Sequence, residues 1–332
     1  MRSFDRRYAA LRGLIDGRLA SLVPRSKPRD LMDGSRYVLR TEGKRIRPVM
    51  VMLSCEAAGG RARDALDAAV ALEMLHNFTL VHDDVMDDAP SRRGHATVHT
   101  RWGVNTAILV GDVILGMAYR TLLRSHARNL PEAMELFTEG LVEVCRGQGL
   151  DVAYERDSTI TMRDYYRMID SKTGKLFSTA ARLGGVLGHA SPRHSRSLGI
   201  FGQCIGRAFQ VQDDLLDVIA DEGHLGKRIG GDIVSGKKTF LLVEALRRAR
   251  GRDRRHLRLL MSRRRGRLSA GGERRRVDLV TALYARCGVM DAARERIRIE
   301  TGAGLRALET LPRSGAREML RWMAGMLVQR SY

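Results

Sequence analysis

The segment from residue 80 to residue 87 reads LVHDDVMD, with two adjacent aspartates and a third three positions after the second. A segment of the same form, FQVQDDLLD, occupies residues 209–217. Apolar residues at helical spacing surround both, which predicts that each aspartate cluster lies on an α-helix. On a helix the first and last aspartates of a cluster, four positions apart, project from one face. The chain therefore presents a pair of carboxylates from each of two helices.

Each pair of carboxylates is costly unless something neutralises it. Two negative charges about 6 Å apart repel by about 3 kcal/mol at an effective dielectric near 20. A solvated acidic face is the alternative, but the residues that flank both clusters are apolar, so it fits poorly. Carboxylate oxygens suit hard cations, and Mg²⁺ combines one or two protein carboxylates with waters and substrate phosphates. The two clusters together predict one shared Mg²⁺ site.

The rest of the chain predicts an all-α protein. Its 332 residues can bury a large core, only 7 are proline, and helical periodicity is interrupted mainly at glycine and proline. Strand-like alternation is missing and no segment resembles a linker. We therefore expect residues 1–332 to form one large helical bundle domain with its site at one mouth. The aspartate helices are expected to end at Ala89-Pro90 and near Glu222-Gly223.

Several features indicate the compartment. The most apolar run, Ala107 to Tyr119, is too short for a membrane span and contains Asp112. The cysteines are widely spaced in apolar helical surroundings and form no CxxC pair; they are Cys55, Cys145, Cys204 and Cys287. We expect them to be buried thiols in a reducing compartment, which favours the cytoplasm.

The formal net charge of +20 raises the possibility of a nucleic-acid binder. Residues 247–276 contain fourteen arginines against Asp253 and Glu273, so this stretch supplies +12 of the total. It has no aromatic residue to stack on a base and no nucleic-acid motif. A solvated basic helix and loop is expected, and contact with anionic lipid or nucleic acid remains the alternative.

Basic residues that could bind phosphate recur beside the aspartate clusters. They occur in residues 43–48 (GKRIRP), 92–94 (RRG), 172–175 (KTGK), 226–227 (GK) and 236–239 (GKKT). Arginine can clamp phosphate oxygens with two hydrogen bonds, and lysine acts as a mobile point charge. Single motifs of this kind are common in a basic protein, but their placement around paired aspartates favours a diphosphate ligand.

Taken in order, these motifs resemble those of the trans-isoprenyl diphosphate synthases of the polyprenyl synthase family. The resemblance covers nearly the whole chain and includes residues 43–48, His76, residues 82–87, 92–94, 111–112, 147–148 with Asp151, 172–174, 209–217, 226–227, 231–232 and 236–239. It implies the helical isoprenoid synthase fold, with the active site in a central cavity. It also implies a head-to-tail condensation of isopentenyl diphosphate with an allylic diphosphate (dimethylallyl, geranyl or farnesyl) by ionisation, condensation and elimination.

The resemblance assigns roles to individual residues. Three Mg²⁺ ions per active site would be held by Asp83, Asp87 and Asp213, with Asp84, Asp214 and Asp217 completing the coordination directly or through water. The remaining charge of the allylic diphosphate would be taken by Arg92, Lys172, Lys227 and Lys237. Thr173 and Gln210 would steady the carbocation and position the departing diphosphate. The diphosphate of isopentenyl diphosphate would be held by Lys44, Arg47, His76 and Arg93.

His76 is a lone histidine on an apolar helix, and such a residue is more often packed in the core. His76 lies two turns before Asp83 on the same helical face, which favours a role in the site. His82 lies well off that face, and a hydrolase metal site of His76, His82 and Asp83 is therefore disfavoured.

The expected product length depends on a resemblance at two residues only. Phe78 followed by Thr79 resembles the pattern of archaeal-type geranylgeranyl diphosphate synthases, in which the aromatic residue forms a floor below the first aspartate motif. The expected product is therefore geranylgeranyl diphosphate (C20), with farnesyl or longer (C25 and above) products as alternatives. An unbent helix places Phe78 nearly opposite the aspartates, so core packing of Phe78 is a second interpretation.

Other departures and alternatives complete the sequence argument. His95, Ala96 and Leu241 stand where the family commonly has lysine, proline and proline, but none is an expected metal ligand. A class I terpene cyclase is disfavoured, because its second motif would mix Asn, Ser and Glu. A non-catalytic subunit is also disfavoured, because such a subunit usually lacks one aspartate cluster. The family also implies a homodimer. No nucleic-acid partner is expected, and peripheral contact with a membrane is possible.

Overall fold

The computed structural model describes residues 2–125, 129–155, 157, 159–219, 230–262 and 269–328. The helices in these ranges are α1 (Arg2–Leu22), α2 (Arg29–Arg40), α3 (Ile46–Ala57), η1 (Ala62–Ala65), α4 (Leu66–Met86), α5 (Val98–Trp102), α6 (Val104–Leu122), α7 (Leu130–Tyr154), α8 (Met162–Ile169), the π-helical turn η2 (Asp170–Gly174), α9 (Lys175–Leu187), α10 (Pro192–Ile219), α12 (Gly231–Ser235), α13 (Phe240–Arg248), α14 (Gly251–Ser262), α15 (Ala270–Arg286), α16 (Val289–Leu308) and α17 (Gly315–Val328). The prediction of an all-α protein is confirmed.

One small element departs from that prediction. Strands β1 (Ser91–Arg92) and β2 (His95–Ala96) form an antiparallel hairpin directly after the first aspartate cluster. Each strand has only two residues, so it is too short to show the alternation that identifies a strand in a sequence. The hairpin returns the chain toward α4 and thereby brings Arg92 back to the aspartates.

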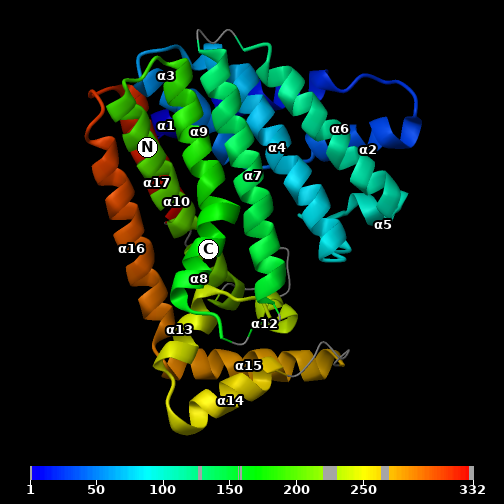
Figure 1. The fold of residues 1–332 in the computed structure, drawn as a ribbon, viewed down its shortest axis with the longest axis vertical. Coiled ribbons are helices and arrows are strands. Elements are labelled where there is room, and N and C mark those ends of the chain that lie inside the picture. Colours follow the sequence, from blue (N-terminus) through cyan, green and yellow to red (C-terminus); the bar gives the residue numbers. More distant parts are fainter. Residues whose placement is uncertain are drawn as a thin grey trace.

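The helices form a bundle in which α4, α7, α9 and α10 run side by side, and α14 and α15 lie across the lower end (Figure 1). Helix α9 packs against α3, α7 and α10, while α4 packs against α3 and α6. Glycines permit the close approach of α9 to its neighbours. A Cβ atom at Gly184 would lie 2.2 Å from the carbonyl oxygen of Val51, and one at Gly202 of α10 would lie 2.3 Å from that of Phe177.

Two apolar clusters form the core. The larger one gathers side chains from α1 to α7, α9, α10 and α17, and the smaller one gathers side chains from α8, α10 and α12 to α16. Helix α10 contributes Phe201 and Ile205 to the larger cluster, and Val211 and Leu215 to the smaller one. The second aspartate cluster thus lies on a helix that is anchored in both.

Helix ends and cysteines test further expectations. Helix α4 ends at Met86 with Asp87 as its C-cap, close to the expected break, whereas residues 222–223 lie outside the described residues. Cys55 and Cys204 are buried, but the expected burial of Cys145 and Cys287 is wrong: Cys145 is exposed and Cys287 is half-buried. Cys145 lies on the solvent side of α7, since its neighbour Val144 faces the core.

Among the helices described, none is long and apolar enough to cross a membrane.

Candidate active site

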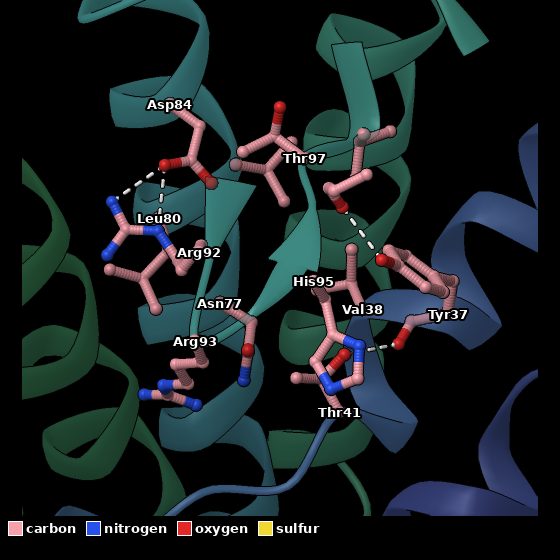
Figure 2. Close-up of a pocket in the computed structure, with 13 residues that line it drawn as sticks. Tyr37, Val38, Thr41, Asn77, Leu80, Asp84, Arg92, Arg93, His95 and Thr97 are labelled. Carbon is pink, nitrogen blue, oxygen red and sulfur yellow. Dashed lines mark hydrogen bonds and ion pairs between the residues drawn. The ribbon is translucent and has the colours of Figure 1, made fainter. Parts of the chain in front are cut away.

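The first aspartate cluster lies in the last turn of α4, where its three carboxylates have different surroundings. Asp84 is buried, and Arg92 of β1 donates from both Nε and Nη2 to its Oδ1 at 2.7 Å (Figure 2). Asp87 is exposed, and the carboxylate of Asp83 makes no hydrogen bond or ion pair with any described residue. Burial, together with the nearby Asp87, raises the pKa of Asp83 to about 6. The unpaired carboxylate is therefore the one that most needs a cation.

In the second cluster, on α10, one aspartate is again bound by the protein while another is not. Asp214 is buried, and its carboxylate accepts hydrogen bonds from Tyr165 Oη at 2.7 Å, Gln210 Nε2 at 2.9 Å and the Phe240 amide at 2.8 Å. Burial and, after it, the charge of Asp232 raise the pKa of Asp214 to about 7. Asp213, in contrast, is exposed and has no partner in the described part of the chain. In both clusters the second aspartate is buried and hydrogen-bonded, whereas the carboxylate of the first has no partner among the described residues. The half-buried Asp83 and the exposed Asp87 and Asp213 are called the outward carboxylates below.

An ion pair joins the surroundings of the two clusters. Lys237 follows the second cluster in sequence, and its Nζ lies 3.5 Å from Oδ2 of Asp87 in the first. Burial alone would lower the pKa of Lys237, but the charges of Asp232, Asp87 and Asp151 raise it. These three carboxylates come from separate segments of the chain. The amide of Asp232 donates to Oδ2 of Asp217 at 3.0 Å, so Lys237 and Asp232 together link the surroundings of the two clusters.

A second lysine belongs to the same surroundings. Lys172 lies in the π-turn η2, and its Nζ is 2.5 Å from Oδ2 of Asp151 on α7. The approach of the turn to α7 requires Gly147, because a Cβ there would lie 2.3 Å from the Lys172 amide nitrogen. The charge of Lys172 also opposes the rise in the pKa of Asp83. Short π-helical turns are often found at functional sites, and this one presents a cation to the first cluster.

The same π-turn holds Thr173, which is expected from the sequence, with Gln210, to steady the carbocation. Thr173 Oγ1 donates to Gln210 Oε1 at 2.7 Å, and Gln210 Nε2 in turn donates to Asp214. Tyr165 ends this chain of hydrogen bonds with its donation to Asp214. Sequence reasoning placed Thr173 and Gln210 together but missed Tyr165. No signal in the sequence could have identified it, because a tyrosine on α8 is paired with Asp214 only by the packing of the helices.

A separate cluster of basic residues lies around α3 and α4. Arg47 donates from Nη1 to Nε2 of His76 at 3.1 Å, and its guanidinium lies 4.6 Å above the ring centroid of Phe177. The Nε atom of Arg47 is buried without a hydrogen-bond partner. Burial and, to a smaller extent, the charge of Arg93 lower the pKa of Arg47 to about 10, against the opposing charge of Glu73. The structure thus brings together three of the four residues expected to bind isopentenyl diphosphate, with a buried donor that has no partner.

Arg45 fixes the segment that carries Lys44 and Arg47. It is buried and left-handed, with φ 49°, and donates from Nε to Asp16 at 2.7 Å and from Nη1 to Glu73 at 2.8 Å. Sequence reasoning counted this arginine only as part of the motif. Its two carboxylate partners come from α1 and α4, so no local pattern revealed that it serves to position its neighbours.

Phe78 lies on the side of α4 that faces α6. It is 8% exposed, and its ring meets that of His82 edge to face with centroids 4.6 Å apart. His82 Nε2 lies 3.1 Å from the Ile108 carbonyl oxygen on α6. His82 therefore packs between Phe78 and α6. Thr79 donates its hydroxyl to the carbonyl of His76, which leaves little bulk beside Phe78.

On another side of α4 there is a small cavity of about 50 Å³ between α2, α4 and the hairpin (Figure 2). Its lining includes Asn77, Leu80 and Asp84 of α4, with Arg92 and Arg93 of the hairpin. Phe78 does not line this cavity. The first cluster therefore has the hairpin arginines on one side and the Phe78–His82 pair on another.

Comparisons with known proteins agree with this geometry. The model of a family described as polyprenyl synthetase matches residues 28–275. The chain belongs to the polyprenyl synthetase family. It is an isoprenyl diphosphate synthase, a prenyltransferase, and the sequence-based identification of the family is confirmed.

Three proteins align with this synthase over nearly their full lengths. It is 35% identical to a short chain isoprenyl diphosphate synthase of Methanothermobacter thermautotrophicus, over 96% of both chains. A geranylfarnesyl diphosphate synthase of Natronomonas pharaonis is 33% identical, with 98% of this chain and 97% of the relative covered. The crystal structure of a geranylgeranyl pyrophosphate synthetase from Pyrococcus horikoshii superimposes with a TM-score of 0.92 at 35% identity, over 99% of both chains.

The donor set of the synthase suits a hard cation. The outward carboxylates of Asp83, Asp87 and Asp213 offer only oxygen atoms. Among the described residues, no three acidic, histidine or cysteine side chains lie close enough to hold an ion by themselves. Mg²⁺ usually combines one or two protein carboxylates with waters and substrate phosphates. The expected role of Lys227 lies outside the described residues.

The neutral state of His76 makes stability depend on pH. Burial and then the charge of Arg47 keep the pKa of His76 well below its usual value. A histidine with a lowered pKa in the folded state binds fewer protons than in the unfolded state, so stability is lost as pH falls through 6.5. We expect the contribution of His76 to the unfolding free energy to decrease between pH 7 and pH 5, by at most about 1.4 kcal/mol per pH unit, while the raised pKa values of Asp83 and Asp214 act in the opposite direction. His76→Gln should remove this contribution in urea titrations.

His95→Gln provides the control, because His95 is exposed on the hairpin. If His76→Gln and the unchanged synthase lose stability equally over this pH range, His76 is not held neutral in the folded protein.

Proposed function

We propose that the synthase condenses isopentenyl diphosphate with an allylic diphosphate, head to tail, and that its main product is geranylgeranyl diphosphate. The observation that supports this most strongly is the separation of two anion-binding zones. The ion pair of Lys237 with Asp87 marks the zone of the aspartate clusters, and the contact of Arg47 with His76 marks the other. Two diphosphates need two such zones, and a hydrolase would need only one.

Three Mg²⁺ ions would neutralise the allylic diphosphate as it leaves. Asp83, Asp87 and Asp213 would hold them, with Asp217 taking part through water. Asp84 and Asp214 are buried and already hydrogen-bonded, so their proposed role is to fix the helix ends that carry the outward carboxylates. This differs from the direct ligation by Asp84 that the family resemblance allowed.

The chain's own cations would stabilise the departing diphosphate. Arg92, Lys172 and Lys237 surround Asp83 closely enough to influence its pKa, and Lys227 would join them. Ionisation leaves an allylic cation, which the hydroxyl of Thr173 and the amide of Gln210 would face. The double bond of isopentenyl diphosphate would then attack the cation, and a proton would pass to a diphosphate oxygen. No enzyme nucleophile is needed.

Isopentenyl diphosphate would bind to Lys44, Arg47, His76 and Arg93. Because Arg47 can only donate, Nε2 of His76 accepts, and its proton resides on Nδ1. A neutral histidine of this tautomer can donate one hydrogen bond to a diphosphate oxygen. The rigid stack of Arg47 on Phe177 would hold its remaining donors in place before the substrate arrives.

Product length provides a test of the proposed C20 product. Phe78 is expected to be the floor of the elongation cavity, because it is the bulky residue below the first cluster and is followed by the small Thr79. Phe78→Ala should shift the product from C20 to C25 and longer. Chromatography of the dephosphorylated products made from farnesyl and isopentenyl diphosphates would measure this. A geranylfarnesyl synthase among the relatives makes C25 the main alternative for the unchanged protein.

Phe137→Ala is the matched control, since it removes the same volume from a fully buried site beside Tyr119 of α6. It should destabilise the protein but leave the product at C20. An unchanged product for Phe78→Ala would make Phe78 a core residue, while a C15 product from the unchanged synthase would overturn the C20 proposal.

The proposal also covers the domain organisation, the oligomeric state and the location of the synthase. We propose that residues 1–332 form one domain, which the contribution of α10 to both apolar clusters supports. A homodimer is supported by exposed apolar residues on α6, where Val104, Ile108 and Leu109 are 49%, 41% and 54% exposed. A cytoplasmic location is supported by the free cysteines.

A further inference from the structure

The outward face of α14 is a basic surface with one apolar side chain. Leu257 and Leu260 face inward and belong to the smaller apolar cluster. On the opposite face Arg255 and Arg258 are exposed, and Leu259, one turn after Arg255, is 53% exposed. This helix therefore exposes about half of a leucine side chain on a cationic face.

The arginines of this face differ from other arginines nearby in having no acidic partner. Arg247 and Arg248 of α13 both bind Glu244 at 2.6 Å, and Arg286 of α15 binds Asp253 at 3.1 Å. Arg294 and Arg298 of α16 likewise pair with Asp291 and Glu295, at 2.7 Å and 2.6 Å. Arg252, Arg255 and Arg258 form no ion pair with any residue that the structure describes. Their positive charge is thus available to a partner outside the chain.

We propose that the outward face of α14, defined by Arg252, Arg255, Arg258 and Leu259, docks on an anionic lipid surface. Arginines complement acidic headgroups, and each one near such a surface strengthens binding about fivefold. The exposed leucine favours lipid over nucleic acid, because it gains only where an apolar phase can receive it. Residues 247–276 also contain no aromatic side chain on which a base could stack.

The position of α14 gives this contact a consequence for the reaction. Helix α15 packs against α14 and also against α12, which follows the second aspartate cluster and contacts α10. Both α14 and α15 lie across the end of the bundle to which the C-terminal end of α4 points (Figure 1). A membrane bound at α14 would therefore lie near the site from which a C20 diphosphate departs. This consequence depends on the proposed function, whereas the docking itself does not.

Vesicle flotation tests the docking with the full-length protein. The unchanged synthase should float with vesicles of phosphatidylglycerol and phosphatidylcholine, and far less with phosphatidylcholine alone. Arg255→Gln/Arg258→Gln should weaken this binding about 25-fold, because two arginines are lost. The matched control is Arg193→Gln/Arg196→Gln, an exposed pair at the same spacing at the start of α10. This control should bind like the unchanged protein.

A second variant distinguishes lipid from nucleic acid. Leu259→Gln keeps the charge, so it should weaken vesicle binding but leave any binding of a single-stranded RNA oligomer unchanged. Equal binding of the α14 double variant and the control would overturn the proposal, as would binding of RNA but not of anionic vesicles. Prenyl transfer in vesicle-free buffer should persist in all these variants. Its absence from the unchanged protein would refute the proposed function and leave the docking result standing.

Discussion

Asp83→Asn is expected to lower kcat/KM for prenyl transfer by a factor on the order of 10³, the size typical for loss of one group that stabilises developing charge. Asp83 has no partner among the described residues, and its pKa is raised to about 6 because burial and Asp87 penalise its charge. A bound cation would reverse that penalty. Asparagine keeps the shape of the side chain but removes the charge that attracts Mg²⁺. Steady-state rates over a range of Mg²⁺ concentrations would measure the loss.

Asp88→Asn is the control for this variant. Asp88 lies five positions after Asp83, its side chain is fully exposed, and its left-handed φ of 49° suits asparagine. It should retain full activity. Above pH 6, Asp83→Asn should also be at least as stable as the unchanged protein, because it removes a carboxylate that burial disfavours. If activity survives in Asp83→Asn, or is lost in proportion to stability, the carboxylate does not bind the catalytic metal.

Arg47→Gln is expected to raise KM for isopentenyl diphosphate about 100-fold, while KM for the allylic substrate changes little. Two charge-assisted hydrogen bonds to a diphosphate contribute about 3 kcal/mol in total, which corresponds to this factor. Arg47 is already held by His76 and by the ring of Phe177, and its Nε has no partner. Initial rates with each substrate varied in turn would separate the two constants.

Arg40→Gln is the matched control, since Arg40 ends α2 and is exposed. It removes the same charge from the same half of the molecule and should alter neither KM. Equal increases in both Michaelis constants for Arg47→Gln would contradict two separate anion zones, because a single shared zone would weaken for both substrates.

Much of the site could be predicted from the sequence because its signals are local. The four-residue spacing of Asp83 and Asp87 fixes both on one helical face, whatever the rest of the fold does. The all-α prediction had the same local basis, since helical periodicity is a property of each segment. The two-residue strands of the hairpin escaped it because they are shorter than any period.

What the sequence did not determine are the partners that come from distant segments. Sequence alone treated Asp83 and Asp84 as similar ligands. In the fold, Arg92 returns through the hairpin to pair with Asp84, and Tyr165 of α8 pairs with Asp214. The exposure of Cys145 and the isolation of the arginines on α14 depend in the same way on which helices pack together.

The sequence by itself thus determined the helical fold, the family and the types of residue at the site. Helix spacing and motif order are encoded along the chain and need no knowledge of neighbours. Tertiary structure decided which carboxylate of each cluster is neutralised by protein and which remains for a metal. That choice follows from burial and from contacts such as the hydrogen bond of Tyr165 with Asp214, which joins residues 49 positions apart. The energies of such contacts depend on distance in space, so only packing could set them.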